Sequence, residues 1–289
     1  MDLPLALHTA ARRFCASQHY RWSREYMQLG ETGEDRVPTS GLGWDYSNAA
    51  YGLFPRYRLD QAIGNEVERL TGLAFHSLDE TRKSLLEAGR HSLPPLIREF
   101  QQSREACAAL NDELQAFEQY IAGLEAIQLG QIEPLPYRRV LGDSESEQLW
   151  KDLRARWGVT GHYWYPLSEP SPHTNVIAFH QELWKKRDGT SVLLQAVQEQ
   201  GIERCVLLRE GPPDYEIDSS LIDPTYRGDE SFLTSDFEWL VYSSHESSIA
   251  VAGWLADFYR ARWSDWESIA YGGPFHTTDL RGTWGILKP

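Results

Sequence analysis

The chain has little cysteine, little lysine and no long apolar run. Its 289 residues include only Cys15, Cys107 and Cys205, and no C-x-x-C pair occurs. Sparse, widely spaced thiols exclude a disulfide framework and predict small, mostly buried apolar side chains in a reducing compartment. Only five of the 28 basic residues are Lys, and this preference for Arg is typical of GC-rich bacterial genomes.

No segment approaches the roughly 20 apolar residues that a membrane-spanning helix needs. The most apolar stretch, SSIAVAGWLA at 247–256, is short and contains Ser and Gly. The first residues, MDLPLALHTAARRF, lack the basic start and long apolar core of a secretory signal. We therefore expect a cytoplasmic protein with no membrane partner.

The charge balance is acidic. Asp and Glu number 42 against 28 Lys and Arg, which gives a formal net charge of −14. This balance argues against a broadly basic nucleic-acid binder, and a hydrophobic content of 41% argues against disorder. The G-x-S-x-G elbow of hydrolases and the G-x-x-x-x-G-K-[ST] phosphate loop are both absent, so no specific catalytic motif names an activity.

Residues 1–130 are predicted to form a helical region. Apolar spacing predicts one helix over 5–29 and another after Pro55, separated by a Gly-bearing loop over 30–52. A shorter helix is expected to begin at Asp79 and to end at Gly89.

The clearest periodicity follows Pro94 and Pro95, where nine positions alternate spacings of four and three residues. All nine except Ser103 are apolar; the positions are Leu96, Phe100, Ser103, Cys107, Leu110, Leu114, Phe117, Ile121 and Leu124. This heptad seam predicts one continuous helix over 95–129. The helix could dimerise as a coiled coil, but we favour the long arm of an antiparallel hairpin, since an exposed Phe-bearing seam needs a partner.

A Pro-bearing linker, QIEPLP at 131–136, precedes an α/β region over 137–289. We expect strands at 137–142, 161–167 and 203–210, and a hairpin that pairs 236–244 with the residues after 247. Helices are expected at 144–157, 191–201 and 254–263, and a loop at 211–235. The predicted fold class is α+β or α/β: a helical N-terminal region with a long heptad-patterned helix, then a mixed sheet covered by helices. The two regions can pack as one body.

Two histidine groups are candidate catalytic or metal sites. His162, His173 and His180, with Glu182, offer zinc or iron ligands, but their spacing matches no standard pattern, so we expect no metal and no cofactor. His245 lies among serines in YSSHESS, which suggests a nucleophilic dyad. Neighbouring strand residues point to opposite faces, so we expect a structural role in the turn and assign no catalytic residue.

Aromatic residues at 44–57 alternate with Arg56 and Arg58, a combination that can stack on bases or on another flat ligand. Packing over the helical core, with Arg at the rim, is the favoured interpretation.

The acidic segment 210–238 carries nine acidic residues and one Arg. Carboxylates interleaved with aromatic and aliphatic side chains predict a docking surface for a basic protein, and the alternative is a solvated loop. The candidate partner-binding residues are Asp214, Tyr215, Glu216, Asp218, Tyr226, Asp229, Glu230 and Phe232.

The segment FEWLVYSSHESSIAVAGW at 237–254 resembles the closing hairpin of some small bacterial proteins, among them predicted immunity proteins of toxin systems. The resemblance implies no functional residues. We therefore expect a cytosolic bacterial module that neutralises or sequesters a basic protein partner, such as an immunity protein against a toxin. The alternatives are a hydrolase-type enzyme that uses His and acidic residues of the C-terminal half, and a coiled-coil scaffold.

Overall fold

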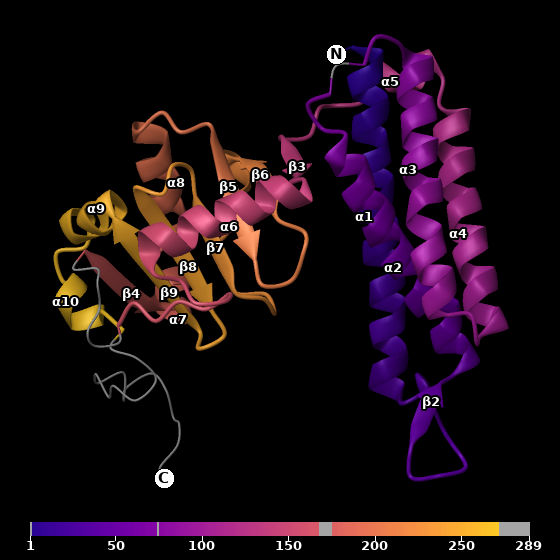
Figure 1. Cartoon of the computed structure of the whole chain (residues 1–289), viewed down its shortest axis with the longest axis horizontal. Coiled ribbons are helices and arrows are strands. Elements are labelled where there is room, and N and C mark those ends of the chain that lie inside the picture. Colours follow the sequence, from indigo (N-terminus) through magenta and orange to yellow (C-terminus); the bar gives the residue numbers. More distant parts are fainter. Residues whose placement is uncertain (1, 74, 168–174, 272–289) are drawn as a thin grey trace. The chain divides into compact units, whose positions relative to one another are not determined.

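The computed structural model describes residues 2–73, 75–167 and 175–271. The chain divides into two compact units, Met1–Leu135 and Pro136–Pro289, each with its own hydrophobic core (Figure 1). The first unit is helical and the second combines a sheet with helices, so of the two predicted classes, α+β and α/β, the structure confirms α+β. The sheet that was expected to be mixed is antiparallel in every described pairing. In the described ranges, no helix is both long and apolar enough to cross a membrane.

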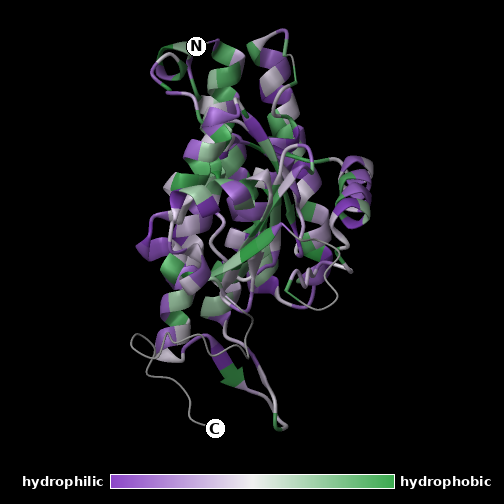
Figure 2. Cartoon of the chain, turned by 90° about the vertical axis from the view of Figure 1, so that its left-hand side faces the viewer, coloured by the Kyte–Doolittle hydropathy of each residue, from purple (hydrophilic) through white to green (hydrophobic). Residues whose placement is uncertain are grey.

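Four long helices build the first unit. They are α1 (Leu3–Thr32), α2 (Asn48–Arg69), α3 (Leu78–Glu99) and α4 (Arg104–Gly123), followed by the short α5 (Ala126–Leu129). Serine hydroxyls cap three of them: Ser47, Ser77 and Ser103 accept the backbone N–H groups of Ala50, Glu80 and Ala106 at 3.1 Å. Hydrophobic and hydrophilic residues alternate along these helices (Figure 2), and the apolar faces form the core.

The heptad seam lies in this core, but not on one helix. Leu96 belongs to α3, whereas Leu110, Phe117 and Ile121 belong to α4 and are fully buried. The predicted continuous helix over 95–129 is wrong because the chain turns at 100–103, where Ser103 caps a new helix. The α3 and α4 helices form a hairpin, but neither is the long arm over 95–129 that we favoured; they share one core, which keeps the apolar spacing across the turn.

Three helix boundaries also differ from the expectation. The α2 helix begins before Pro55, and α3 begins at the Ser77 cap rather than at Asp79. The α3 helix continues through Gly89, which lies against α4: a Cβ there would lie 3.0 Å from the Phe117 ring. This glycine therefore permits close helix packing rather than ending a helix. The expected loop over 30–52 contains a small ribbon, β1 (Arg36–Pro38) paired antiparallel with β2 (Trp44–Tyr46).

The second unit contains a seven-stranded antiparallel sheet in the order β3-β6-β5-β7-β8-β9-β4. Its strands are β3 (Arg138–Val140), β4 (Val176–His180), β5 (Arg204–Arg209), β6 (Tyr215–Asp218), β7 (Ser231–Thr234), β8 (Trp239–Ser244) and β9 (Ser248–Gly253). Its helices are α6 (Asp143–Trp157), α7 (Gln181–Lys186), α8 (Gly189–Glu199), α9 (Trp254–Arg262), α10 (Trp266–Ile269) and the 3-10 turn η1 (Ser219–Leu221).

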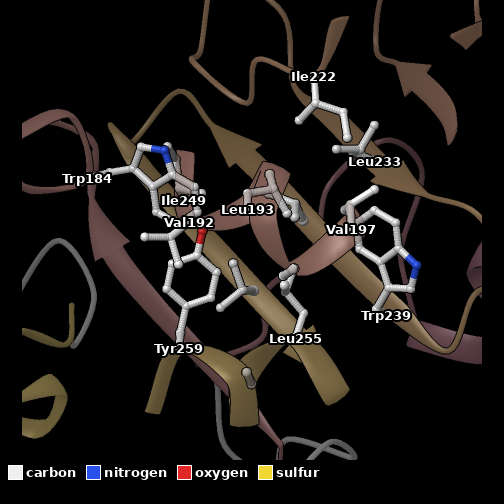
Figure 3. Close-up of a cluster of buried hydrophobic side chains, with 14 of the residues drawn as sticks. Trp184, Val192, Leu193, Val197, Ile222, Leu233, Trp239, Ile249, Leu255 and Tyr259 are labelled. Atoms are coloured by element: carbon white, nitrogen blue, oxygen red, sulfur yellow. The ribbon is translucent and has the colours of Figure 1, made fainter. Parts of the chain in front are cut away.

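Helices cover both faces of this sheet. Trp150, Leu153 and Trp157 of α6 pack on one face, and α7, α8 and α9 pack on the other through residues that include Trp184, Leu193 and Tyr259 (Figure 3). The predicted hairpin is confirmed as β8 paired with β9. All six residues of β8 are buried, because the side chains on each face of the strand meet a layer of helices.

The interpretation of residues 211–235 as a loop is wrong. The β6 strand lies between β3 and β5, and β7 lies between β5 and β8. Ile217 and Phe232 supply these strands with buried apolar side chains. The expected strand over 161–167 is also wrong, because Tyr163 forms an isolated bridge with Thr160 and residues 161–167 form no strand.

Candidate functional site

Three neighbouring strands bring charged residues together at one end of the sheet. Glu210 follows the last residue of β5, Glu230 precedes the first residue of β7, and His245 follows the last residue of β8. Since β5, β7 and β8 are adjacent and antiparallel, these three positions meet at the same end.

The buried carboxylate of Glu230 fixes His245. Glu230 is fully buried, and its Oε1 accepts hydrogen bonds from His245 Nδ1 and, at 3.0 Å, from the His245 backbone N–H. A carboxylate can only accept here, so Nδ1 carries the proton. The side chain of His245 is 59% exposed, so its other ring nitrogen is left for solvent or a ligand. The hydrogen bond that His245 Nδ1 donates to Glu230 raises the pKa of His245 above its ordinary value.

A second pair lies beside the first. Tyr163 donates its hydroxyl hydrogen to Glu210 Oε1 at 2.5 Å, and the Tyr163 and His245 rings form a T-shaped pair at a centroid distance of 6.2 Å. The hydrogen bond from Tyr163 lowers the pKa of Glu210 and raises that of Tyr163. Glu210 therefore stays ionised to a lower pH than an ordinary glutamate.

We name these residues, with their two neighbours Tyr226 and Glu246, the strand-end patch; its members are Tyr163, Glu210, Tyr226, Glu230, His245 and Glu246. Glu246 is exposed in the β8–β9 turn, and its backbone N–H donates to Ser244 Oγ at 3.1 Å. Tyr226 is half-buried and is positioned by a 3.0 Å hydrogen bond from its backbone N–H to Gln181 Oε1.

The strand-end patch is electronegative. It holds three carboxylates and one histidine, and neither Glu210 nor Glu246 forms an ion pair with Lys or Arg in the described ranges. Two carboxylates that form no ion pair among the described residues, beside two partly exposed tyrosines, can bind an ammonium or guanidinium group and pack against its apolar stem.

Several predicted partner-binding residues are buried and do not face solvent. Asp214 is 8% exposed and accepts hydrogen bonds from Ser146, from Trp150 Nε1 at 2.8 Å and from the Arg209 backbone at 2.7 Å. Phe232 is fully buried and stacks on Tyr242 at 4.6 Å. Asp214 and Phe232 therefore hold the sheet together rather than offering a contact surface.

The other predicted residues are partly exposed but internally engaged. Glu216 accepts hydrogen bonds from Arg139 at 3.0 Å and from Tyr137 at 2.9 Å, and Asp229 pairs with Arg209. Asp218 caps η1 through Ser220, and Arg138 lies over the Tyr215 ring at 5.6 Å. Of the predicted set, the strand-end patch retains Glu230 and Tyr226, with Asp229 as the residue before Glu230.

Of the predicted histidine positions, the two that the structure describes, His162 and His180, make other contacts. The His162 ring packs on Trp150 at 4.9 Å, and His180 Nδ1 accepts the Glu182 backbone N–H at 3.2 Å. His173 lies outside the described residues. No group of three or more His, Cys, Asp or Glu in the described part of the chain could hold a metal ion.

The other two candidates are used in packing. Arg56 forms ion pairs with Asp112 and Glu113 at 3.1 Å, and Arg58 pairs with Glu99 at 3.2 Å. Phe54 contacts Phe100 at 5.5 Å. Most of the heptad seam is buried within its own unit, and Cys107, Leu114 and Leu124 are partly buried.

No family model matches the chain, and no curated protein or solved structure matches it either. The arrangement of side chains is therefore the basis for a functional assignment.

Proposed function

We propose that the chain is a cytoplasmic bacterial protein that neutralises or sequesters a basic protein partner, as an immunity protein does for a toxin. The observation that carries the proposal is that Glu210 and Glu246 both act electrostatically on the fixed His245, and that neither carboxylate forms an ion pair with Lys or Arg among the described residues. A Lys or Arg side chain of the partner would replace solvent at these carboxylates and pack on Tyr163 and Tyr226.

The distribution of charge supports this location. Across the acidic segment 210–238, arginines pair with Glu216, Asp223, Asp229 and Glu238, and Asp214 is buried. The arginines largely neutralise the four paired acids, and Asp214 is shielded from solvent. These five acids therefore add little attraction for a partner. The chain's net charge of −14 adds long-range attraction for a basic protein.

The test is site-specific photo-crosslinking in the source cells. A benzophenone amino acid replaces Glu246 in one variant and, as the matched control, Glu199 in another. Glu199 is exposed at the end of α8, near the start of β5, and therefore at the opposite end of the sheet. We expect position 246 to capture one basic protein that position 199 does not capture.

The captured partner then permits kinetic measurements. The double variant Glu210→Gln, Glu246→Gln should associate more slowly than wild type at low salt, and the difference should shrink above physiological ionic strength. The control double variant Glu199→Gln, Glu203→Gln removes the same charge from the opposite end of the sheet. Capture of no basic protein, or equal slowing by both double variants, would contradict the proposal.

A hydrolase is the second candidate, favoured by the contact between His245 and Glu230. A buried carboxylate on Nδ1 leaves Nε2 able to take a proton from water, as in general-base catalysis. Activity on a nitrophenyl ester that disappears in His245→Ala and shows a single acidic inflection in its pH profile would support this candidate. Equal rates for wild type and variant would remove it.

A further inference from the structure

A cavity of about 330 Å³ lies at one end of the helical unit, outside the strand-end patch. The first turns of α1 form one wall, and the residues that follow α2 form the other. Leu5, Leu70, Leu73 and Phe75 make its lining largely apolar. This volume is at the lower end of the range typical of small-molecule sites, roughly 300–1,000 Å³.

One polar wall of the cavity is His8, which is 3% exposed. Its Nε2 lies 2.8 Å from the Val67 carbonyl oxygen, so Nε2 carries the proton and donates it to that oxygen. Nδ1 is then a hydrogen-bond acceptor, and within the described residues it has no donor. Burial lowers the pKa of His8, so the ring stays neutral and keeps this acceptor at physiological pH.

The second polar group is Asp2. It occupies the N-cap position of α1, but its side chain makes no capping hydrogen bond. An ionised carboxylate at the cavity wall attracts a cation and repels an anion. The cavity thus offers an acceptor, a negative charge and apolar walls, and the described lining contains no Lys or Arg.

We propose that this cavity binds a small hydrophobic primary amine. The ammonium group would donate hydrogen bonds to His8 Nδ1 and to the Asp2 carboxylate, and the hydrocarbon part would pack among Leu5, Leu70 and Leu73. This site goes beyond the proposed protein-binding function and lies in the other unit, so either can fail without the other.

Three probes of nearly equal size test the head-group preference on the full chain by NMR titration. They are 2-phenylethylamine, 2-phenylethanol and phenylacetate, which present a cationic donor, a neutral donor and an anion. We expect the amine to bind most tightly and phenylacetate to bind about tenfold or more weakly, because charge-assisted hydrogen bonds are lost and repulsion appears.

Variants at exposed positions locate the site without disturbing the core. Leu73 is 57% exposed, so Leu73→Trp can block the cavity without unfolding the helices, and it should abolish amine binding. Asp2→Asn should bring the affinity of the amine close to that of the alcohol. Glu31→Gln, an exposed acid at the other end of α1, is the matched control and should change neither affinity.

The outcomes separate this site from the strand-end patch. Amine binding that is unchanged in Glu210→Gln, Glu246→Gln places the ligand in the helical unit. Equal binding of phenylacetate and the amine, full amine binding by Leu73→Trp, or no binding of any probe at millimolar concentration would overturn the proposal.

Discussion

Glu230 and His245 lie 15 residues apart in the sequence, yet one carboxylate oxygen of Glu230 accepts hydrogen bonds from both the ring and the backbone of His245. The contact joins the start of β7 to the end of β8 and fixes the first residue of the β8–β9 turn. An exposed imidazole with a buried carboxylate beneath it is held in one orientation, which suits a group that contacts a partner.

The pKa of His245 depends on this contact. Glu230→Gln removes the charge that stabilises the imidazolium, so the pKa of His245 should fall towards or below its ordinary value of 6.5. Glu246→Gln is the matched control, because Glu246 raises the same pKa less strongly. NMR titration of the imidazole measures both variants. An unchanged pKa in Glu230→Gln would show that the hydrogen bond does not form in solution.

The same contact makes stability depend on pH. Because the folded-state pKa of His245 is raised above 6.5, its stabilisation is fully present below that pH. It is lost as the pH rises through the folded-state pKa. The difference in free energy of unfolding between wild type and His245→Asn should therefore be larger at pH 5.5 than at pH 8.5. Denaturant unfolding at the two values checks this, and an equal difference at both would contradict it.

Asp60 predicts a pH effect in the helical unit. It is fully buried in α2, and neither of its carboxylate oxygens has a hydrogen-bond partner within the described residues. Burial, followed by the nearby Glu113 carboxylate, raises the pKa of Asp60 to about 9. The folded chain thus holds a proton that the unfolded chain loses near its ordinary value of 3.8. The contribution of this proton to the free energy of unfolding is fully present below pH 3.8. It is lost progressively as the pH rises from there to about 9.

The variant Asp60→Asn cannot ionise, so it should gain stability relative to wild type as the pH rises from 5 to 9. Denaturant unfolding followed by the helical circular dichroism signal measures this gain. Asp79→Asn, whose side chain is 95% exposed in wild type, is the control and should show no such trend. A constant difference between Asp60→Asn and wild type across this range would mean that Asp60 is ionised in the folded chain.

Two glycines with positive φ separate backbone strain from steric overlap. Gly201 has φ +67° with open space around it, so Gly201→Ala should cost roughly 1–2 kcal/mol of stability. Gly253 has φ +69°, but a Cβ there would lie 2.0 Å from the Glu238 carbonyl oxygen. Gly253→Ala should therefore destabilise clearly more than Gly201→Ala. Equal midpoints of thermal unfolding for the two variants would contradict the close contact between Gly253, at the end of β9, and Glu238, which precedes β8.

The sequence predicted the elements whose periodicity is local. The strand at 203–210, the β8–β9 hairpin and the helix that ends at Trp157 agree with the structure within a few residues. The turn at 100–103 escaped prediction because both helices bury the same seam, so the apolar spacing continues across it. Ser103 was the available signal, since it is the one polar seam position and a favoured N-cap residue.

The candidate site was predicted only in part. Charge density identified the acidic segment, but not which acids are neutralised by Arg139, Arg204 and Arg209 from other positions in the chain. The pairing of Glu230 with His245, and of Tyr163 with Glu210, depends on strand order, which local patterns do not contain. The high density of apolar residues around Phe232 was the signal that β7 is a buried strand rather than a docking loop.

The proposed binding function is tested most directly by the association rate of the partner captured at position 246, measured at low salt. We predict slower association for Glu210→Gln, Glu246→Gln than for Glu199→Gln, Glu203→Gln, with nearly equal dissociation rates, because rim carboxylates act mainly on the encounter. Association of the strand-end double variant at the rate of the control variant would contradict the assignment of the strand-end patch as the partner-binding surface.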